Sequence, residues 1–553
     1  MQSPTLLVIG GVAAGTKAAA KAKRENPHWQ VTVLTRDQHI SYAGCGLPYY
    51  LSGVISEERE LLVRFPEDFK LDYDIDVLTR HEVTEIMPDL KKVLATDLLT
   101  GEAKEFHYDK LIIATGADPV LPPIPNIQLE NIYTLRKVTD GNAIRQLIDQ
   151  SQVKEAVIIG GGLIGLEVAE NLVHRGINTT IVEMAGQVLP PFDPEIALKV
   201  QTHLQEKGVA VKTGVKVTGF IDNGAGQVKA VETSDGTIPA DLVVVSAGIR
   251  PNVAVAQRAG ILLGPTRAIQ VNQYMQTNQP DIYAVGDCAE VTHQVTGKPA
   301  WMPMGSVANK AGRVAGANAV GENNLSFPGA LGTAIVKVFD VAAGKTGLTE
   351  REARAQGYDV ETVLVPTPDK AHYYPGNRQL VVKLVAEKSS HRLLGGQVVG
   401  EGAADKVVDV LATAIGLKAK VDDLSSMDLA YAPPFSSAMG PTILAANVML
   451  NKLRGKFQGV SPLHLAERQT AGAVVIDVRL PEEHMIYAIP GSKNIPFREL
   501  TKQLADMDRH QEIILVCKVG VRAYVASLKL KQMGFTNVSI LDGGISAYPF
   551  ELA

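Results

Sequence analysis

The sequence predicts a multidomain α/β protein, because one structural plan occurs twice in it. In each copy an apolar strand runs into a glycine-rich turn and then into a helix; the two copies span Leu6–Gly15 and Val157–Gly165. Strands that are apolar throughout are typical of parallel sheets with both faces covered. The chain has 553 residues, more than one hydrophobic core accommodates. We therefore expect two similar α/β domains with further domains beside them.

Each copy is completed by a later apolar strand that ends in a small-residue turn. The strand of the first copy is Leu111–Gly116, and that of the second is Leu242–Gly248. A further strand, Asp281–Asp287, ends in Gly-Asp and follows the second copy. This order predicts that the second domain is inserted within the first. The first domain then comprises residues 1–120 and 245–325, and the second comprises residues 121–244.

The rest of the chain changes character twice. Short alternating strands followed by a helical stretch at Ala404–Ala414 predict an α+β domain over residues 326–450. Residues 451–462 contain glycine, proline and charged side chains, which is typical of a linker. Strand–helix alternation resumes over residues 463–553, where the apolar run Ile513–Cys517 predicts a buried strand. The C-terminus is therefore expected to form a small α/β domain.

Composition excludes several classes of function. The chain carries 54 basic and 59 acidic residues, a net charge of −5, so no basic surplus favours nucleic-acid binding. It has three cysteines, too few for a secreted disulfide scaffold. We find no apolar run of about 18 residues that would span a bilayer, and the apolar stretch Leu6–Ile9 predicts a strand rather than a signal peptide. We expect a cytoplasmic protein, without membrane insertion, and assign no metal site.

The second glycine turn has the full spacing of a dinucleotide-binding turn, with Gly160, Gly162 and Gly165. Glycines there let the backbone approach a pyrophosphate, to which the helix N-terminus offers N–H groups. Glu183 ends the next strand, where a carboxylate binds ribose hydroxyls and repels a 2′-phosphate. We therefore expect NADH, with NADPH as the weaker alternative. The residues assigned to NAD are Gly160, Gly161, Gly162, Ile164, Gly165, Glu183 and Gly248.

The first glycine turn departs from this pattern. Gly10 and Gly15 fit, but Val12 replaces the middle glycine and Thr35 stands where an acid is expected. A threonine hydroxyl still bonds to a ribose, and Asp287 at a strand end is suited to a polyol such as the ribityl chain of FAD, in addition to a helix-capping role. We interpret this domain as FAD-binding. The residues assigned to FAD are Gly10, Gly11, Ala13, Ala14, Gly15, Thr35, Arg36, Ala114, Thr115, Gly116, Gly286 and Asp287.

Cys45 lies between two glycines in the segment Ser41–Tyr50. A nearby helix N-terminus is expected to lower the pKa of such a thiol and to favour the thiolate. A two-cysteine flavin reductase carries its second thiol five residues on, and that position here holds Tyr50. We predict that Cys45 cycles as a lone thiol, through a mixed disulfide, a persulfide or a sulfenic acid. The alternative is a small buried side chain, which is our interpretation of Cys288.

A second reactive cysteine, Cys517, opens a short loop that ends at Arg522, between a buried strand and a helix at Ala523–Lys531. Converging N–H groups and the charge of Arg522 are expected to stabilise a thiolate or a persulfide anion. The Cys-x4-Arg spacing is one residue shorter than the loop that cysteine phosphatases need for a tetrahedral phosphate. It resembles rhodaneses, which predicts sulfur transfer; the alternative is an inactive interaction module. Three further segments share this resemblance: Asp477–Arg479, Ile489–Pro496 and Leu541–Gly544.

Five segments together resemble the coenzyme A disulfide reductase branch of the pyridine nucleotide-disulfide oxidoreductases. They are Gly10–Gly15, Ser41–Tyr50, Gly160–Gly165, Gly286–Asp287 and Tyr431–Phe435. With the C-terminal domain included, nearly the whole chain resembles the fused form known as coenzyme A disulfide reductase–rhodanese or NADH-dependent persulfide reductase. The resemblance implies a rhodanese-like α/β domain at the C-terminus and a homodimer formed through the α+β domain.

The resemblance also implies roles for residues outside the motifs. It places Tyr373 and Tyr431 near the flavin and the partner subunit's Cys45, where a phenol can protonate a leaving thiolate; interface packing is the alternative. Lys17, Lys21 and Arg24 share one helix face. Their spacing alone fits a solvated face as well, and the resemblance implies that the phosphates of coenzyme A bind there. We add Ser41, Gly44 and Lys70 to the residues expected to contact coenzyme A.

These features predict an FAD-dependent reductase of coenzyme A persulfide, polysulfide and coenzyme A disulfide. It takes electrons from NAD(P)H through Cys45 and carries a rhodanese domain that binds or delivers sulfane sulfur. Three alternatives stay open: a plain coenzyme A disulfide reductase with an accessory tail, an NADH oxidase that acts through a sulfenic acid at Cys45, and a redox sensor without turnover. The rhodanese-like tail favours sulfur over oxygen as the acceptor.

Overall fold

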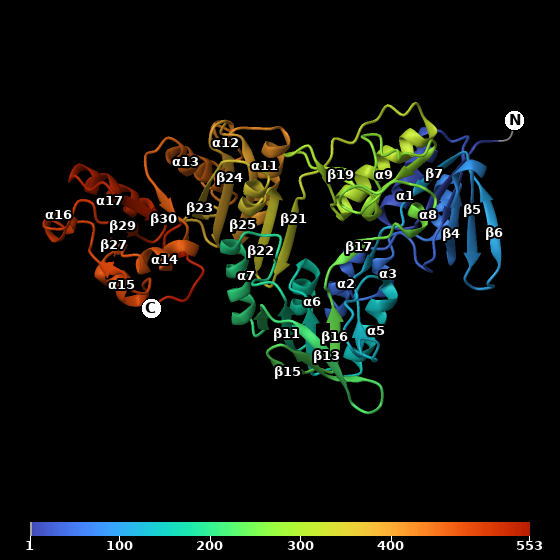
Figure 1. The fold of residues 1–553 in the computed structure, drawn as a ribbon, viewed down its shortest axis with the longest axis horizontal. Helices are drawn as coiled ribbons and strands as arrows, with labels where there is room; N and C mark the ends of the chain where they lie inside the picture. Colours follow the sequence, from blue (N-terminus) through green and yellow to red (C-terminus); the bar gives the residue numbers. More distant parts are fainter. Residues whose placement is uncertain (1–2) are drawn as a thin grey trace. The chain divides into compact units, whose positions relative to one another are not determined.

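The structure is a computed structural model that describes residues 3–553. The chain forms two compact units, which Figure 1 traces from the N-terminus in blue to the C-terminus in red. The first unit contains the chain up to Met184 together with Val215–Gly332, and the second contains Ala185–Gly214 with Thr333–Ala553. No helix among residues 3–553 combines the length and the apolar character needed to cross a membrane.

The first unit contains a parallel five-stranded sheet in the order β18-β7-β1-β2-β3. Its strands are β1 (Thr5–Ile9), β2 (Gln30–Leu34), β3 (Ile75–Leu78), β7 (Lys110–Ile113) and β18 (Ile282–Ala284). β18 comes after the second glycine turn in sequence, yet it pairs with β7 of the first sheet. The predicted insertion of one α/β domain in the other is therefore confirmed.

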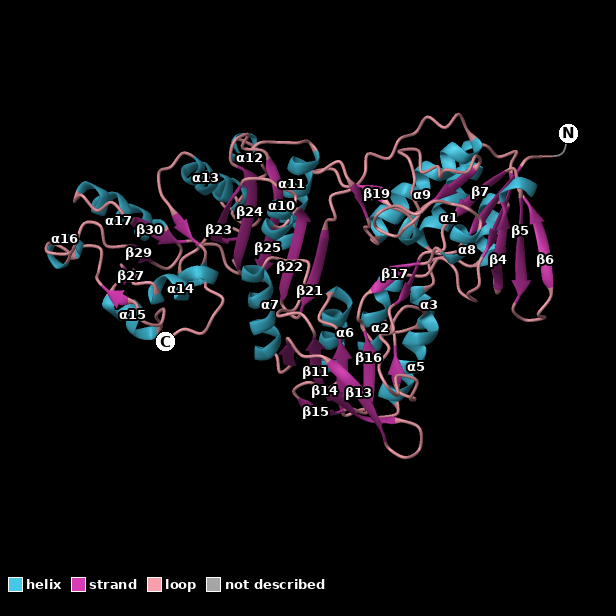
Figure 2. Ribbon diagram, viewed as in Figure 1, coloured by secondary structure: helices cyan, strands magenta, loops and turns pink. Residues whose placement is uncertain are grey.

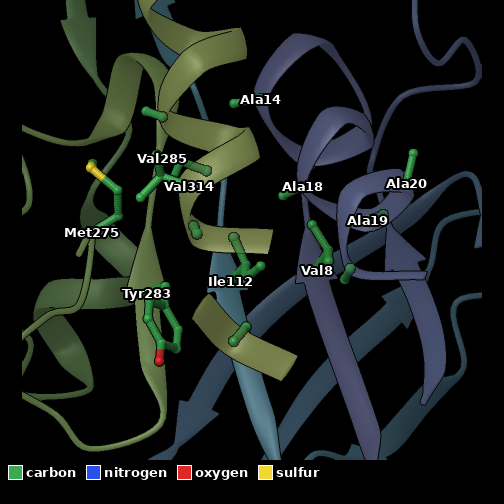
Figure 3. Packing of buried hydrophobic residues seen from close by; sticks show 14 of the residues in the cluster. Val8, Ala14, Ala18, Ala19, Ala20, Ile112, Met275, Tyr283, Val285 and Val314 are labelled. Atoms are coloured by element: carbon green, nitrogen blue, oxygen red, sulfur yellow. The ribbon is translucent and has the colours of Figure 1, made fainter. Parts of the chain in front are cut away.

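Two helices cover one face of this sheet at unusually close range. They are α1 (Ala13–Glu25) and α9 (Gly305–Val320). A Cβ atom at Gly312 would lie 2.5 Å from the carbonyl oxygen of Ala14, and one at Gly316 would lie 2.2 Å from that of Ala18. Glycine and alanine thus allow the two backbones to approach each other. Figure 3 shows buried side chains of these helices and of the strands that they cover, which tie the first strand–turn–helix unit to the segment after the insertion.

A second parallel sheet in this unit runs in the order β11-β10-β16-β9. Its strands are β9 (Ile132–Tyr133), β10 (Glu155–Ile159), β11 (Asn178–Glu183) and β16 (Leu242–Val245). The helices nearby are α2 (Leu47–Ser52), α5 (Val138–Asp149) and α6 (Leu163–Val173). The two sheets thus each begin with a buried strand, a glycine turn and a helix, as the repeated plan predicts.

Smaller elements complete the first unit. Two antiparallel three-stranded sheets comprise β4 (His81–Met87), β5 (Lys92–Asp97) and β6 (Ala103–His107), and β13 (Val217–Asp222), β14 (Val228–Thr233) and β15 (Gly236–Pro239). Two strand pairs are β8 (Ala117–Pro119) with β17 (Ile249–Pro251), and β19 (Val291–Thr292) with β20 (Pro299–Ala300). The short helices are α3 (Glu58–Leu61), α4 (Pro66–Tyr73) and α8 (Ala254–Arg258).

The second unit contains an antiparallel sheet in the order β21-β22-β25-β24-β23, visible in magenta in Figure 2. Its strands are β21 (Ala334–Val338), β22 (Val341–Gly347), β23 (Val360–Pro368), β24 (Gln379–Glu387) and β25 (Leu393–Gly400). The accompanying elements are α7 (Pro194–Glu206), β12 (Ala210–Thr213), α10 (Glu350–Ala355), α11 (Ala404–Gly416), α12 (Val421–Ser425) and α13 (Pro441–Leu453). The predicted helical stretch corresponds to α11.

The C-terminal part of this unit is a parallel sheet in the order β26-β30-β29-β27-β28. Its strands are β26 (Gly459–Val460), β27 (Val474–Asp477), β28 (Lys493–Asn494), β29 (Ile513–Val516) and β30 (Val538–Leu541), and its helices are α14 (Leu465–Thr470), α15 (Pro481–Ile486), α16 (Leu500–Gln503) and α17 (Val521–Gln532). The segment interpreted as a linker is ordered: it contains the end of α13 and the edge strand β26.

Candidate active site

The glycine turn of the second sheet leaves an open space beside its backbone. Gly160 has φ +111°, and a Cβ there would lie 2.3 Å from the carbonyl oxygen of Ser246. A Cβ at Gly165 would lie 2.1 Å from the Gly160 oxygen, so α6 begins directly on the strand. A Cβ at Gly162, by contrast, has no atom of the described chain within 4 Å. The turn therefore has room for a pyrophosphate at the N-terminus of α6.

Glu183 lies at this same turn. Its carboxylate accepts a hydrogen bond of 2.7 Å from the Gly161 N–H, although the two residues are 22 positions apart. The side chain is thereby held at the end of β11, where ribose hydroxyls of a bound dinucleotide would be recognised. The local geometry fits NAD at the position that the sequence predicts.

The first glycine turn has the same backbone geometry with different side chains. Gly10 has φ +115°, and a Cβ there would lie 2.1 Å from the Ala114 oxygen, while one at Gly15 would lie 1.9 Å from the Gly10 oxygen. Val12 therefore does not disturb the turn. Thr35 is buried, and its methyl carbon lies 3.1 Å from the position of a Cβ at Gly11. Arg36 donates to Asp118 at 2.7 Å.

The remaining residues assigned to FAD surround Asp287. Gly286, with φ +76°, turns the chain at the end of β18, and Ala114, Thr115 and Gly116 follow β7, the neighbouring strand. Burial raises the pKa of the Asp287 carboxyl, and Arg136, at 3.2 Å, opposes that rise. A half-buried carboxylate at a parallel strand end is suited to a polyol hydroxyl, so the site fits FAD. Arg136 was missed in the sequence, because nothing in its surroundings marks a partner 151 positions away.

Cys45 lies in a short 3₁₀ turn, Gly44–Gly46, immediately before α2. Of the three cysteines, all within the described part of the chain, Cys45 alone is exposed. Partial burial raises the pKa of its thiol, the carboxylate of Glu167 raises it further, and Arg136 acts in the opposite direction. The expectation of a lowered pKa is therefore wrong, because burial and a nearby anion outweigh the helix N-terminus.

Two groups near Cys45 were not identified from the sequence. The Tyr49 hydroxyl lies 3.4 Å from a carboxylate oxygen of Glu167, which is on α6 of the other nucleotide-binding domain. Burial raises the pKa of Glu167 to about 7, against the opposing hydrogen bond from Tyr49. A carboxyl group that titrates near neutrality can hold or release a proton at the pH where thiols react. The available signal was an acid two positions after Gly165 on a largely apolar helix that also carries Glu170.

Tyr50 occupies the position of the second redox cysteine, and its side chain is held by contacts within the chain. The Tyr50 hydroxyl donates to Asn142 at 3.0 Å, and the Arg145 guanidinium lies 4.3 Å from the centre of the Tyr50 ring. Cys288 is fully buried, and its thiol donates to the Val285 oxygen at 3.3 Å. Cys288 is thus the small buried side chain that we expected.

The cations expected to bind coenzyme A differ in their surroundings. Lys17 is exposed on α1. Lys21 pairs with Glu25, and the Arg24 guanidinium lies 5.7 Å from the ring centre of Tyr73. Lys70 pairs with Asp74 at 2.7 Å and Asp76 at 3.0 Å. Ser41 and Gly44 lie in the segment that leads to Cys45, and the Ser41 N–H donates to the Gly11 oxygen at 2.8 Å. That bond connects the cysteine segment to the first glycine turn.

Tyr373 and Tyr431 belong to the second unit and are 65% and 51% exposed. A hydrogen bond to Tyr431 raises the pKa of Tyr373. The two phenols therefore form one exposed pair rather than two independent groups. Phe435 nearby in sequence is 69% exposed, and such aromatic groups are typical of a contact surface.

The Cys517 loop has the opposite character to the Cys45 turn. Cys517 is 1% exposed at the end of β29. Its Sγ accepts hydrogen bonds from the N–H groups of Gly520 at 3.1 Å and Ala523 at 3.4 Å, at the start of α17. Gly520 has φ +104°, a conformation that favours glycine. Backbone dipoles thus converge on the sulfur, as predicted, and suit an anionic thiolate or persulfide.

Arg522 does not supply a free charge to this loop. It donates to both carboxylate oxygens of Glu483, at 2.6 and 2.7 Å. The arginine lowers the pKa of Glu483 to about 2. The stabilisation of an anion at Cys517 therefore rests on the backbone N–H groups first. The Arg522–Glu483 pair joins α17 to α15 beside the loop, a contact that the local motif did not reveal.

Comparisons with known proteins agree with this arrangement. Residues 4–310 match the family described as Pyridine nucleotide-disulphide oxidoreductase, and residues 333–443 match its dimerisation domain. This chain belongs to the pyridine nucleotide-disulphide oxidoreductases. Residues 461–549 match the Rhodanese-like domain. The predicted fold class is confirmed: two Rossmann-like domains, one inserted in the other, are followed by an α+β dimerisation domain and a rhodanese-like α/β domain.

Similar proteins cover most of this chain, and two solved structures cover 99% of it. The chain is 38% identical over 450 residues to a Pyrococcus furiosus protein named NAD(P)H sulfur oxidoreductase (CoA-dependent), covering 81% of this chain and 100% of that protein. Among solved structures, reduced Bacillus anthracis CoADR-RHD matches with a TM-score of 0.94 and 36% identity over 99% and 98% of the two chains. An NAD-dependent persulfide reductase from A. fulgidus matches with a TM-score of 0.92 and 41% identity over 99% and 100%.

Proposed function

We propose that this flavoprotein uses NAD(P)H to reduce persulfides, polysulfides and coenzyme A disulfide through the single redox cysteine Cys45. A rhodanese domain with Cys517 binds and delivers the sulfane sulfur. One observation carries the proposal: the chain joins an exposed lone thiol, in a segment bonded to the first glycine turn, to a buried thiol held by N–H groups. The Pyrococcus furiosus and A. fulgidus relatives, which are named for sulfur and persulfide reduction, support it.

Specific residues of this chain would hold the two cofactors. Gly10, Gly15 and Asp287 would hold FAD, whose isoalloxazine ring, when bound, supplies two-electron transfer between nicotinamide and sulfur. Gly162 offers space for the pyrophosphate of NADH, and Glu183 would accept hydrogen bonds from its ribose. The same carboxylate would repel the extra phosphate of NADPH, which makes NADH the preferred donor.

The chemistry at Cys45 begins with its thiolate. The thiolate attacks the inner sulfur of coenzyme A persulfide, which forms a Cys45–coenzyme A disulfide and releases hydrosulfide. Two electrons that originate from NADH and one proton then break this disulfide, giving the coenzyme A thiol and the Cys45 thiolate. Glu167, with a pKa of about 7, lies near enough to raise the pKa of the Cys45 thiol. Its carboxyl group is therefore suited to hold that proton.

The substrate and the second subunit complete this site in our proposal. We assign Lys17, Lys21, Arg24, Ser41, Gly44 and Lys70 to coenzyme A. We also propose a homodimer, because residues 333–443 match a dimerisation domain. In the dimer the exposed pair Tyr373 and Tyr431 would face the partner subunit's Cys45 and donate a proton or a hydrogen bond to the leaving sulfur.

The domain boundaries and the compartment are parts of the same proposal. We place the FAD domain at 1–120 and 245–325, the NAD domain at 121–244, the dimerisation domain at 326–450, the connecting segment at 451–462 and the rhodanese-like domain at 463–553. All three cysteines are free, and a thiolate-dependent reductase requires a reducing compartment. We therefore infer that the enzyme works in the cytoplasm.

The test is a steady-state assay of NADH oxidation by purified, FAD-loaded protein. Coenzyme A persulfide, coenzyme A disulfide and O₂ are supplied separately, the first two without oxygen. We expect turnover with the sulfur substrates, with one hydrosulfide released per NADH from the persulfide. Faster turnover with O₂ would identify an NADH oxidase instead. Flavin reduction without turnover on any acceptor would identify a sensor.

A further inference from the structure

The catalytic loop of the rhodanese domain rests on a turn that follows β30. The Ile545 N–H donates to the Cys517 oxygen at 3.0 Å, and the Ser546 N–H donates to the Lys518 oxygen at 2.9 Å. A Cβ at Gly544 would lie 2.3 Å from the Cys517 oxygen. The turn therefore touches the loop backbone directly, and any displacement of the turn moves the residue that carries the reactive sulfur.

The first residue of this turn is held by a side chain from outside the rhodanese domain. The carboxylate of Asp542 accepts a hydrogen bond of 2.8 Å from the ammonium of Lys452, which lies on α13. The same ammonium donates to the Thr362 oxygen at 2.8 Å and pairs with Glu361 at 3.1 Å, both on β23. Lys452 thus ties the turn to the helix and the strand of the preceding domain, which lie next to β30 in Figure 1.

This contact is buried and closely fitted. The side chains of Lys452 and Asp542 are 8% and 10% exposed. A Cβ at Gly459 would lie 2.2 Å from the Asp542 carboxylate, so only glycine leaves room for it. Burial opposes the charge on Lys452, but Asp542 and Glu361 outweigh it and raise the pKa of the ammonium. A buried ion pair of this kind holds its two side chains in place, because separating them would leave each charge without water or another partner to stabilise it.

We propose that Lys452 is a positioning residue for sulfur transfer: by holding Asp542 against α13 and β23, it fixes the turn that sets the Cys517 loop. The inference rests on the proposed sulfur transfer at Cys517 and adds that the dimerisation domain is part of the machinery. The sulfur site therefore depends on two domains. In the transfer itself, the Cys517 thiolate takes the outer sulfur of thiosulfate and releases sulfite; cyanide then removes that sulfur as thiocyanate and restores the thiolate.

The test uses the full-length, FAD-loaded chain, which provides an internal control through its second activity. Lys452→Met is expected to lower thiosulfate–cyanide sulfur transfer more than tenfold. It should also shift the pH dependence of Cys517 alkylation to higher pH, since the Gly520 and Ala523 N–H groups lose their alignment. NADH-driven reduction of coenzyme A disulfide, which uses Cys45, should stay within twofold of wild type. Lys452→Arg keeps the charge and the reach, and should restore most of the transfer.

A matched control is Lys531→Met. Lys531 also bonds across to the preceding segment, donating to the Lys456 oxygen at 3.2 Å, but it is exposed and does not touch the turn. Its loss should leave both activities unchanged. Equal losses in the Lys452 and Lys531 variants would overturn the proposal, as would full transfer in a folded Lys452→Met protein or an unshifted alkylation profile.

Two further results distinguish a failed positioning role of Lys452 from an absent sulfur-transfer activity of the domain. Should Lys452→Met not fold, Asp542→Asn, which removes the negative charge that pairs with Lys452, is expected to shift Cys517 alkylation in the same direction; no shift there overturns the positioning role. A wild-type chain that transfers no sulfur from thiosulfate, polysulfide or a persulfide donor contradicts the proposed function of the domain. The alkylation profile still tests whether Lys452 sets the loop in that case.

Discussion

Cys45 and Cys517 are both followed by a helix, yet their surroundings are opposite. The Cys45 residue is exposed to solvent. Partial desolvation of its sulfur and the carboxylate of Glu167 together raise the pKa of the thiol. Cys517 is buried, and two N–H groups point at its sulfur. An open thiol admits a bulky disulfide and an electron donor, whereas a small N–H-lined loop suits a compact anionic sulfur. The contrast teaches that a helix after a cysteine does not by itself determine what the thiol does.

The largest effect that tests the separate roles of Cys45 and Cys517 is expected from removal of the exposed thiol. Cys45→Ser should lower NADH-dependent reduction of both coenzyme A persulfide and coenzyme A disulfide by about 10³-fold or more, because a serine hydroxyl forms no mixed disulfide. Sulfur transfer from thiosulfate through Cys517 should be unaffected. The measurement is NADH oxidation and thiocyanate formation on the same preparation.

The control for that variant is Cys288→Ser, which should keep activity close to wild type, since the Cys288 thiol is fully buried and donates to nearby backbone oxygens. Substantial reductase turnover in Cys45→Ser would contradict the lone-thiol mechanism. It would also mean that one of the buried thiols becomes accessible during turnover.

The reciprocal change is Cys517→Ser. It should lower sulfur transfer from thiosulfate by about 10²-fold or more, because the persulfide anion can no longer form in the loop. Reduction of a preformed small persulfide or of coenzyme A disulfide should continue at the wild-type rate. Equal loss of both activities would place Cys517 in the reductive cycle, and retention of both would leave the domain with an interaction role.

Local features of both cysteines could be predicted from the sequence, and distant ones could not. The glycines at 10, 15, 160 and 165 are required by close backbone approaches that any strand–turn–helix unit imposes, so their spacing is informative. The N–H groups around Cys517 are also local. By contrast, Asp287 with Arg136, Tyr49 with Glu167, and Asp542 with Lys452 join residues 90 to 151 positions apart. Charge pairing at that separation depends on tertiary packing, which no local pattern encodes.

The direction of the Cys45 pKa was wrong for the same reason. The local pattern, a cysteine just before a helix, predicts a lowered pKa. The decisive anion, Glu167, comes from a helix that begins more than a hundred residues later and belongs to another domain. Residues 451–462 have a composition typical of a linker, and they contain the end of α13 and the edge strand β26, which pairs with β30 through tertiary packing.

A smaller effect is expected at the NADH site, which supplies electrons to Cys45 and not to Cys517. Glu183→Ala should reduce the preference for NADH over NADPH, measured as the ratio of the two kcat/KM values, by about tenfold, or about 1.4 kcal/mol. The carboxylate that repels the 2′-phosphate is lost, together with its bond to the Gly161 N–H. Sulfur transfer through Cys517 should not change. A wild-type enzyme that prefers NADPH would refute the role given to Glu183.

The smallest expected effect is the most specific to the comparison, because it concerns the charge next to Cys45. The pKa of Glu167 is raised from 4.5 to about 7, first by burial. A raised folded-state pKa means that the folded protein binds this proton more tightly than the unfolded chain, so its contribution to stability is present below pH 4.5 and is lost as pH rises through about 7. In the same range the new negative charge raises the pKa of Cys45.

Glu167→Gln should therefore shift Cys45 alkylation to lower pH and increase its rate at pH 7 by less than about fivefold. Tyr49→Phe removes the hydrogen bond that lowers the pKa of Glu167, keeps more of that carboxyl neutral at pH 7, and should act in the same direction with a smaller amplitude. Cys517 alkylation, followed in the same samples by mass spectrometry, should stay constant; an equal shift at both cysteines would show a general loosening of the chain instead of a charge effect at Cys45.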